Sequence, residues 1–145
     1  MPEFRYAKGR VGESIRFITG EMIEFDRDYA TISWEEYARD GKLQKLMDRT
    51  VENILTALIE VCGSILTQQG KTVESYPEAL KECTAFFGFN EDNQENFAKL
   101  ALQRNRLAHR YLNLRWQAIS QYKDRREPIQ KLLGAMLRRE EAKEE

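Results

Sequence analysis

The sequence predicts an all-α protein, folded as an antiparallel bundle of four to five helices. Apolar residues recur at helical spacing almost everywhere, and no stretch alternates for long with the period of two that is typical of a strand. Eight glycines and three prolines in 145 residues are too few for a turn-rich sandwich or barrel. The short predicted loops favour antiparallel neighbours, and the length suits one domain over residues 1–145.

The first helix is expected over about residues 9–29. Apolar side chains spaced by three or four positions draw one stripe along it, made of Val11, Ile15, Ile18, Met22, Phe25 and Tyr29. Ser33, followed three residues later by Glu36, has the pattern of a capping box. A short helical turn should therefore run through Tyr37 until Gly41 interrupts it.

The second long helix is expected over about residues 42–69, a length of ~42 Å. Its apolar stripe consists of Leu43, Met47, Thr50, Ile54, Leu58, Val61 and Ile65. Gly70 should end it. A third helix should begin with Ser75 as its cap and Pro77 in its first turn, and end at Gly88 and Asn90.

A fourth helix should open with the acidic residues 91–95. Its inner face is expected to carry Phe97, Leu100, Ala101, Ala108 and Tyr111. Asn113 should break the chain before a fifth helix that begins near Leu114. Pro128 lies inside the pattern of that helix, which predicts either a kink or two abutting helices. Residues 138–145 form a charged tail that we expect to fray.

Composition excludes several classes of protein. A net charge of −1 does not indicate a nucleic-acid or membrane binder over the whole chain. No apolar run reaches about 18 residues, so no membrane span is expected. The first ten residues lack the apolar segment of a signal peptide, which favours the cytoplasm.

The two cysteines, Cys62 and Cys83, match no zinc spacing and are expected to be buried thiols. We expect neither a metal nor a cofactor.

Charge is distributed unevenly along the second half of the chain. Residues 104–126 contain seven Lys or Arg side chains against one acid, whereas residues 74–96 contain six acids against one base. One interpretation is that these segments balance each other as neighbouring helices. The other is that the basic segment, with Arg106, Arg110 and Arg115, faces the phosphates of an RNA.

The only histidine, His109, lies inside that basic segment. On an ideal helix Asn105 and His109 would share a face, but Arg104, Asn105, His109 and Tyr111 together would span an arc of ~160°. Either the helix distorts or a second chain supplies half of the site. A histidine among guanidinium groups suits metal-independent cleavage of a phosphodiester, with the RNA 2′-OH as nucleophile.

At these residues the chain resembles a known family. The octet Arg104-Asn105-Arg106-Leu107-Ala108-His109-Arg110-Tyr111 matches the pattern of Arg, a polar residue, three spacers, His, any residue and Tyr. It resembles the signature of the HEPN superfamily, in particular the HepT-like toxins of prokaryotic toxin–antitoxin pairs. The layout over about residues 11–136, including the entry at Ser75 to Ala79, is also similar. The resemblance implies a dimeric bundle whose two motifs face each other across a cleft.

The resemblance also implies roles for individual residues. Arg104 would bind and stabilise the phosphate, His109 would act as acid and base or hold the scissile group, and Asn105 would support them. Tyr111 would be the site at which a nucleotidyltransferase antitoxin adds AMP. The chain departs from the pattern after the motif, where an acid is often found and this sequence reads Asn113-Leu114-Arg115.

Three functions remain open from the sequence. The first is an endoribonuclease toxin that acts on RNA as a homodimer and is neutralised by its antitoxin. The second is a non-catalytic binding or substrate-recognition partner of a nucleotidyltransferase. The third is a structural dimer in which the motif has no role. The long apolar stripes of the first, second and last helices favour a homodimer in every case.

Overall fold

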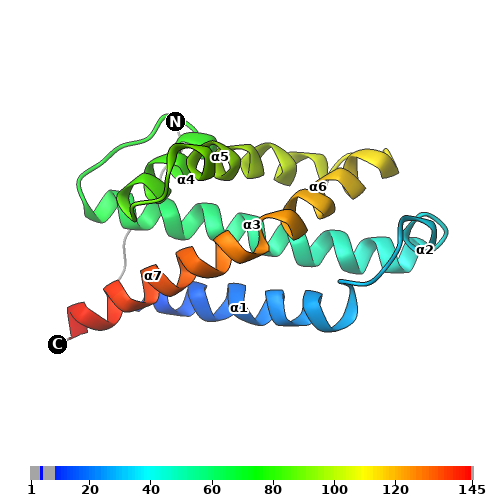
Figure 1. Ribbon diagram of the computed structural model, residues 1–145, viewed down its shortest axis with the longest axis horizontal. Helices are drawn as coiled ribbons and strands as arrows, with labels where there is room; N and C mark the ends of the chain where they lie inside the picture. Colours follow the sequence, from blue (N-terminus) through cyan, green and yellow to red (C-terminus); the bar gives the residue numbers. More distant parts are fainter. Residues whose placement is uncertain (1–3, 5–8, 145) are drawn as a thin grey trace.

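The computed structural model describes residue 4 and residues 9–144, and this part of the chain is helical without strands. The long helices pack as an elongated antiparallel bundle in which α6 and α7 run in the same direction (Figure 1). The predicted all-α class is confirmed, although the described residues form seven helices and not four to five. They are α1 (Arg10–Asp28), α2 (Trp34–Ala38), α3 (Gly41–Gln68), α4 (Tyr76–Phe86), α5 (Glu91–Arg106), α6 (Leu112–Asp124) and α7 (Arg126–Glu144). In Figure 1, α6 and α7 follow each other as one bent rod.

The central element is α3, which contacts α1, α2, α4, α5 and α6. All of its predicted stripe is buried except Leu43, which is partly buried against the core. By length and composition alone α3 could cross a membrane, which corrects the expectation that no segment is apolar enough. In this fold 61% of that apolar window is buried among the other helices, so its side chains form the core of the bundle.

Local capping signals account for most helix boundaries. Ser33 and Glu36 form both hydrogen bonds of the predicted capping box. The Ser75 side chain accepts a hydrogen bond from the Glu78 amide, as its position before Pro77 predicts. Gly70 has a positive φ of 76°, the left-handed conformation that ends α3.

Two boundary residues act differently from the prediction. Gly41 is the first residue of α3 and does not merely interrupt α2, because the Asp40 side chain caps the amides of Lys42 and Leu43. Asn90 caps α5 by accepting from the Asn93 amide, whereas the sequence suggested that it ends the preceding helix.

The main error of the sequence prediction concerns the end of α5. This helix stops at Arg106 and does not continue to Tyr111. The amides of Ala108 and His109 bond to carbonyls three residues back, which tightens the chain into a turn. Ala108 and Tyr111 are exposed, so neither marks an inner face. Asn113 does not break the chain, because it lies in the first turn of α6.

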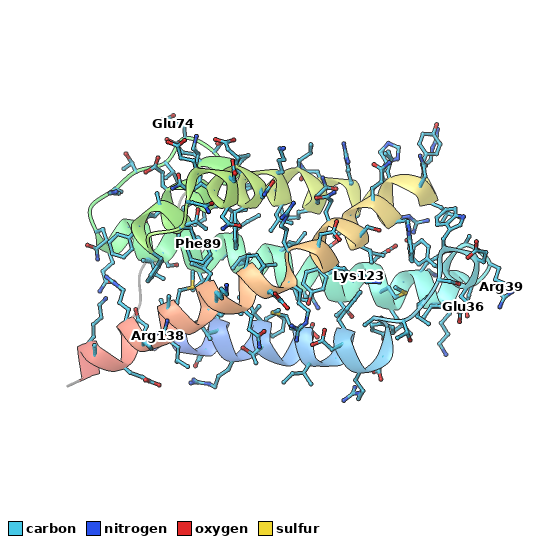
Figure 2. All side chains as sticks on the ribbon, viewed as in Figure 1. Glu36, Arg39, Glu74, Phe89, Lys123 and Arg138 are labelled. Carbon is cyan, nitrogen blue, oxygen red and sulfur yellow. The ribbon has the colours of Figure 1, made fainter. Side chains whose placement is uncertain are left out.

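The C-terminal segment is ordered differently from the predicted frayed tail. Pro128 lies in the first turn of α7, where its missing N–H costs no helical bond, so two abutting helices form there. The helix then continues to Glu144, where Arg139 lies 5.4 Å from the centre of the Phe86 ring and stacks on it. Arg138 lies at this end of the bundle, whereas Glu36 and Arg39 lie at the opposite end (Figure 2).

Both cysteines are buried and free, as the sequence predicts. Burial, together with the neighbouring Cys83 thiol, raises the pKa of Cys62 well above its ordinary value. A thiol with a raised pKa is a poor nucleophile, so these residues act as small core side chains. Among the described residues, no group of three or more His, Cys, Asp or Glu side chains could hold a metal ion.

Candidate functional site

The predicted motif lies at the junction of α5 and α6, at one end of the bundle (Figure 1). Arg104 is in the last turn of α5, and Tyr111 is the N-cap of α6. The helix ends at Arg106 and residues 107–110 are not helical, so Asn105 and His109 do not share a helix face. Of the two explanations for the wide arc of polar groups, the structure therefore shows the first, a distortion of the helix.

Arg104 points away from the turn and toward α3. Its Nε donates a hydrogen bond to Thr56 Oγ1 at 2.9 Å, and its guanidinium carbon lies 5.6 Å from the centre of the Tyr76 ring. These groups border a hollow of about 300 Å³ between α3 and the start of α4. Because Nε is engaged, the two terminal guanidinium nitrogens are the groups that Arg104 can offer to an anion.

His109 presents one ring nitrogen outward. Its Nδ1 accepts a hydrogen bond from the Tyr111 amide at 3.3 Å, and the rings of His109 and Tyr111 pack at 4.8 Å between centres. From this bond we assign the neutral imidazole as the tautomer that carries its proton on Nε2. In this conformation His109 can donate a hydrogen bond from Nε2 to a ligand, which suits holding a phosphate oxygen better than accepting a proton.

Tyr111 is the most accessible aromatic residue of the turn. Its side chain is exposed, with a relative accessibility of 53%, and the Arg110 guanidinium lies 5.3 Å from its ring centre. The observed exposure leaves its ring open to an approaching enzyme.

Two further motif residues lie at the same junction. The Arg106 guanidinium donates to Gln117 Oε1 at 3.1 Å, and a longer contact reaches Gln103 Oε1 at 3.5 Å. These amides are neutral, so the charge of Arg106 stays available to an anion. Asn105 is exposed, and its backbone carbonyl accepts a hydrogen bond from Ala108.

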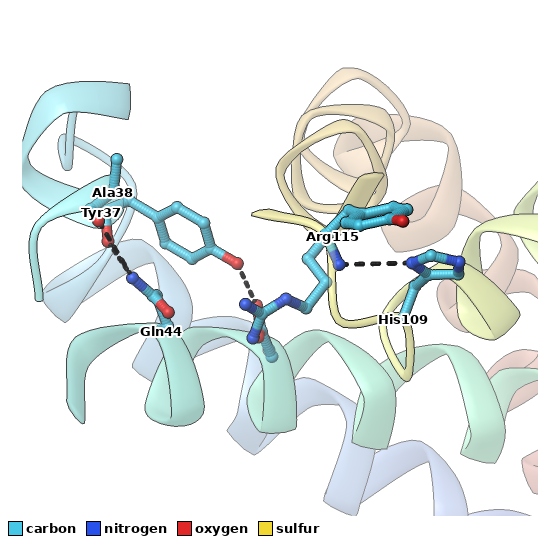
Figure 3. Close-up of polar contacts among 7 residues, drawn as sticks. Tyr37, Ala38, Gln44, His109 and Arg115 are labelled. Carbon is cyan, nitrogen blue, oxygen red and sulfur yellow. Dashed lines mark hydrogen bonds and ion pairs between the residues drawn. The ribbon is translucent and has the colours of Figure 1, made fainter. Parts of the chain in front are cut away.

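Arg115, which the sequence suggested as a phosphate-binding residue, forms an ion pair within the protein. Its Nη1 lies 2.9 Å from the Asp48 carboxylate, and the two side chains are only 18% and 12% exposed. The Tyr37 hydroxyl donates to the same carboxylate at 2.7 Å. Figure 3 shows Tyr37 and Arg115 approaching each other above α3, with His109 on the adjacent turn.

The pKa values of Asp48 and Tyr37 in this cluster are shifted from their ordinary values. Burial raises the pKa of Asp48, although the Tyr37 hydroxyl and the Arg115 charge act in the opposite direction. Burial and the hydrogen bond to Asp48 also raise the pKa of Tyr37. Arg115 is therefore a structural counter-ion, since its charge offsets part of the cost of burying a carboxylate.

Two polar contacts attach the motif to α3, one on each side of the turn. Arg104 precedes the turn and contacts Thr56, and Arg115 follows it and contacts Asp48. Asp48 and Thr56 are eight residues apart on one helix, a separation of about 12 Å. The turn that carries His109 is thus held on the same side of α3 as Arg104.

The structure separates the basic segment into two groups. Several of its cations contact groups elsewhere in the bundle: Arg115 bonds to Asp48 of α3, Arg126 to Asp26 of α1, and the Lys123 ammonium to the Ala30 carbonyl in the turn after α1. Within the part of the chain that the structure describes, Arg104, Arg106 and Arg110 have no acid at ion-pair distance. The acids that pair with Arg115 and Arg126 are Asp48 and Asp26, not the acidic residues 74–96 that the sequence suggested, and the arginines of the motif remain for a phosphate.

Sequence reasoning missed the residues on which the motif rests. Tyr37, Asp48, Thr56 and Tyr76 all contact motif or neighbouring residues, and three of them belong to α2 or α3. Asp48 could have been found from the sequence, because it follows Met47 of the apolar stripe. A carboxylate buried at such a position requires a hydrogen-bond donor or a cation beside it. Thr56 and Tyr76 could not have been found in this way, since both are ordinary residues for a helix surface.

Comparison with protein families assigns the chain to one of them. The family model for HepT-like proteins, described as ribonuclease HepT-like, matches residues 19–132, which is more than three quarters of the chain. The protein therefore belongs to the HepT-like family of the HEPN superfamily. No curated protein matches the chain.

The Asp48 cluster yields a prediction about stability and pH. Arg115→Met removes the counter-ion and leaves the Asp48 charge buried, so the free energy of unfolding should fall by about 3 kcal/mol at neutral pH. The folded-state pKa of Asp48 lies above its unfolded value, and losing Arg115 raises it further. Stability should therefore return as the pH falls through that pKa and Asp48 takes up a proton.

Urea denaturation between neutral pH and about pH 4 measures this effect. Arg49→Met is the matched control, because Arg49 is the exposed neighbour of Asp48 on α3. It should change stability by less than about 0.5 kcal/mol at any pH. A loss in Arg115→Met that is the same across the pH range would contradict a buried, titrating carboxylate.

Proposed function

We propose that this protein is an endoribonuclease toxin that cuts RNA without a metal ion and acts in the cytoplasm. The observation that carries the proposal is the exposed turn of a HepT-like protein on which His109 presents its Nε2 beside arginines without acid partners. Such a turn combines a proton donor with cations for a phosphodiester, and these are the groups that 2′-OH chemistry requires.

In this reaction the RNA 2′-oxygen attacks the adjacent phosphorus, and the bond from phosphorus to the 5′-oxygen breaks. The products are a 2′,3′-cyclic phosphate and a 5′-hydroxyl. Arg104 binds the phosphate and stabilises its transition-state charge, and Asn105 supports it. His109 donates a hydrogen bond from Nε2 to a phosphate oxygen or, after Nδ1 has taken up a proton to form the imidazolium, gives its Nε2 proton to the leaving 5′-oxygen, while the 2′-OH proton passes to water. Arg106 and Arg110 bind neighbouring phosphates.

We propose that the active form is a homodimer. Within one chain Arg104 bonds to Thr56, whereas His109 packs on Tyr111, so the two groups have different partners. A second chain facing the first would bring two turns, each with its own Arg104 and His109, to one cleft. The cleft would also exclude water from the phosphate, which strengthens the contacts with arginine.

The partner we propose is a nucleotidyltransferase antitoxin. The support is the exposure of Tyr111 next to His109 and Arg110. An AMP group on this hydroxyl would add a negative charge and a bulky base at the cleft. It would block RNA both sterically and by repelling its phosphates.

A second candidate keeps the partner but not the catalysis. In it the protein is a binding or substrate-recognition subunit of a nucleotidyltransferase. The observation that favours it is the His109 tautomer, which makes the imidazole a donor rather than a base. A stable complex without RNA turnover would support this second function.

The first test is RNA cleavage by the purified protein in EDTA. Wild type should cut RNA and leave cyclic-phosphate ends, and His109→Ala should lower the rate by at least about 100-fold because the proton donor is lost. Arg16→Ala, which removes an exposed cation on α1, is the matched control and should cut like wild type. All three proteins should first be shown free of AMP by intact mass and compared for dimer formation by light scattering.

Three other results of the cleavage assay would contradict the proposed reaction or the role of His109. Equal cleavage by wild type and His109→Ala would remove His109 from the site. Cleavage only after a metal is added would exclude the proposed chemistry. If unmodified wild type leaves transfer, messenger and ribosomal RNA intact, the nuclease is contradicted and the second function is favoured.

The modification gives a separate prediction. Incubation with the cognate nucleotidyltransferase and ATP should add AMP to wild type and stop cleavage, whereas Tyr111→Phe should gain no mass and stay active. Tyr76→Phe is the control, since Tyr76 is also exposed, at 42%, and should leave the modification unchanged. AMP found on Tyr111→Phe, located by mass spectrometry of its peptides, would place the modification elsewhere.

A further inference from the structure

The hollow beside Arg104 is lined by side chains of different chemistry. Its lining includes the aromatic rings of Phe4 and Tyr76, the acidic Glu60, the hydroxyl of Thr56 and the cationic Arg104. Its volume of about 300 Å³ is that of a small-molecule site. The proposed cleavage reaction uses Arg104 and leaves the rest of this hollow without a role.

The two aromatic rings that line the hollow are held by close packing. The rings of Phe4 and Tyr76 meet edge to face, with centres 6.2 Å apart. Phe4 lies directly on Gly63 of α3, where an added Cβ would come within 2.1 Å of the ring. Thr67 also donates a hydrogen bond to the Phe4 carbonyl at 3.3 Å. Tyr76 remains 42% exposed, so its ring presents a surface on which a planar group can stack.

The Glu60 carboxylate gives the hollow a hydrogen-bond acceptor. Among the described residues the Glu60 carboxylate has no hydrogen-bond or ion-pair partner, and its side chain is exposed. Ser64 already donates to the Glu60 backbone carbonyl, so it adds no competing donor. A carboxylate beside an aromatic ring can bind a planar group that presents two adjacent N–H donors.

The charged residues around the hollow favour one orientation of a bound nucleotide. Thr56 and Glu60 also line a groove of about 340 Å³ between α1 and α3, whose rim includes Glu13 and Glu52. These acids would repel a phosphate chain on that side. Arg104 bonds to Thr56 but does not line that groove, so phosphates are favoured beside Arg104 and a base is favoured inside the hollow.

We infer that this hollow binds a guanine base of single-stranded RNA, next to the phosphate that Arg104 holds. The inference rests on the proposed function for its RNA substrate. The base stacks on Tyr76, and its N1–H and amino group donate to the two oxygens of Glu60. Uracil offers one N–H between two carbonyls, and adenine and cytosine place an acceptor beside their amino group, so guanine fits the carboxylate best.

Binding of RNA that cannot be cut tests this inference apart from catalysis. The probes are fluorescent 2′-O-methyl uridine oligomers whose central base is guanine, adenine, cytosine or uracil, and the readout is fluorescence anisotropy. Wild type should bind the guanine oligomer about tenfold more tightly than the uridine oligomer. Glu60→Gln should remove this preference, and Tyr76→Leu should weaken binding of the guanine oligomer about tenfold. Glu35→Gln on α2, which removes the same charge from an exposed position, should keep the wild-type profile.

The outcomes separate this inference from the proposed nuclease. Equal binding of the four oligomers by wild type, or a guanine preference that survives in Glu60→Gln, overturns the guanine site even if RNA is cleaved. A preference that depends on Glu60 supports it even if no RNA is cleaved, in which case the nuclease alone is contradicted. Guanosine monophosphate is the second arm, because binding as tight as that of the oligomer would assign the hollow to a free nucleotide and overturn the RNA assignment.

Discussion

The burial of α3 is the constraint on which the rest of the structure depends. Five of the other six helices in the described chain contact it, and it carries more of the buried apolar residues than any of them. Because burying such side chains contributes most of the favourable free energy of folding, the direction of α3 fixes where α1, α4 and α5 can pack. The few polar groups on this helix then decide where charged residues of the other helices can be held.

Contacts with α3 explain how the exposed turn between α5 and α6 can hold its side chains in fixed positions. In the turn between α5 and α6 only Leu107 is buried in the core, whereas Ala108, His109, Arg110 and Tyr111 are all exposed. Its position comes from contacts on either side, with Thr56 and Asp48 of α3. A site held in this way keeps its reactive groups accessible to a large substrate while its ends stay fixed, which is the usual relation between a functional loop and its scaffold.

Much of the fold could be predicted from the sequence, because α1 and α3 carry long apolar stripes and Ser33, Ser75 and Gly70 are strong boundary signals. The turn within the motif could not, since no glycine or proline marks it and the apolar spacing continues through it. The motif gave the candidate residues, but the role of Arg115 depends on Asp48, which is 67 residues away in the chain. Contacts of that kind follow from packing and leave no local pattern.

Amide hydrogen exchange tests most directly whether the two contacts with α3 hold the turn. Thr56→Val removes the acceptor of Arg104 with little change of shape, and a hydrogen bond from a charged group contributes about 1.5–3 kcal/mol. The account predicts that exchange of the His109 and Tyr111 amides becomes at least about tenfold faster in this variant, with the amides of α1 unchanged. Unchanged exchange in the turn, or an equal acceleration throughout the protein, would show that the turn is held by something other than α3.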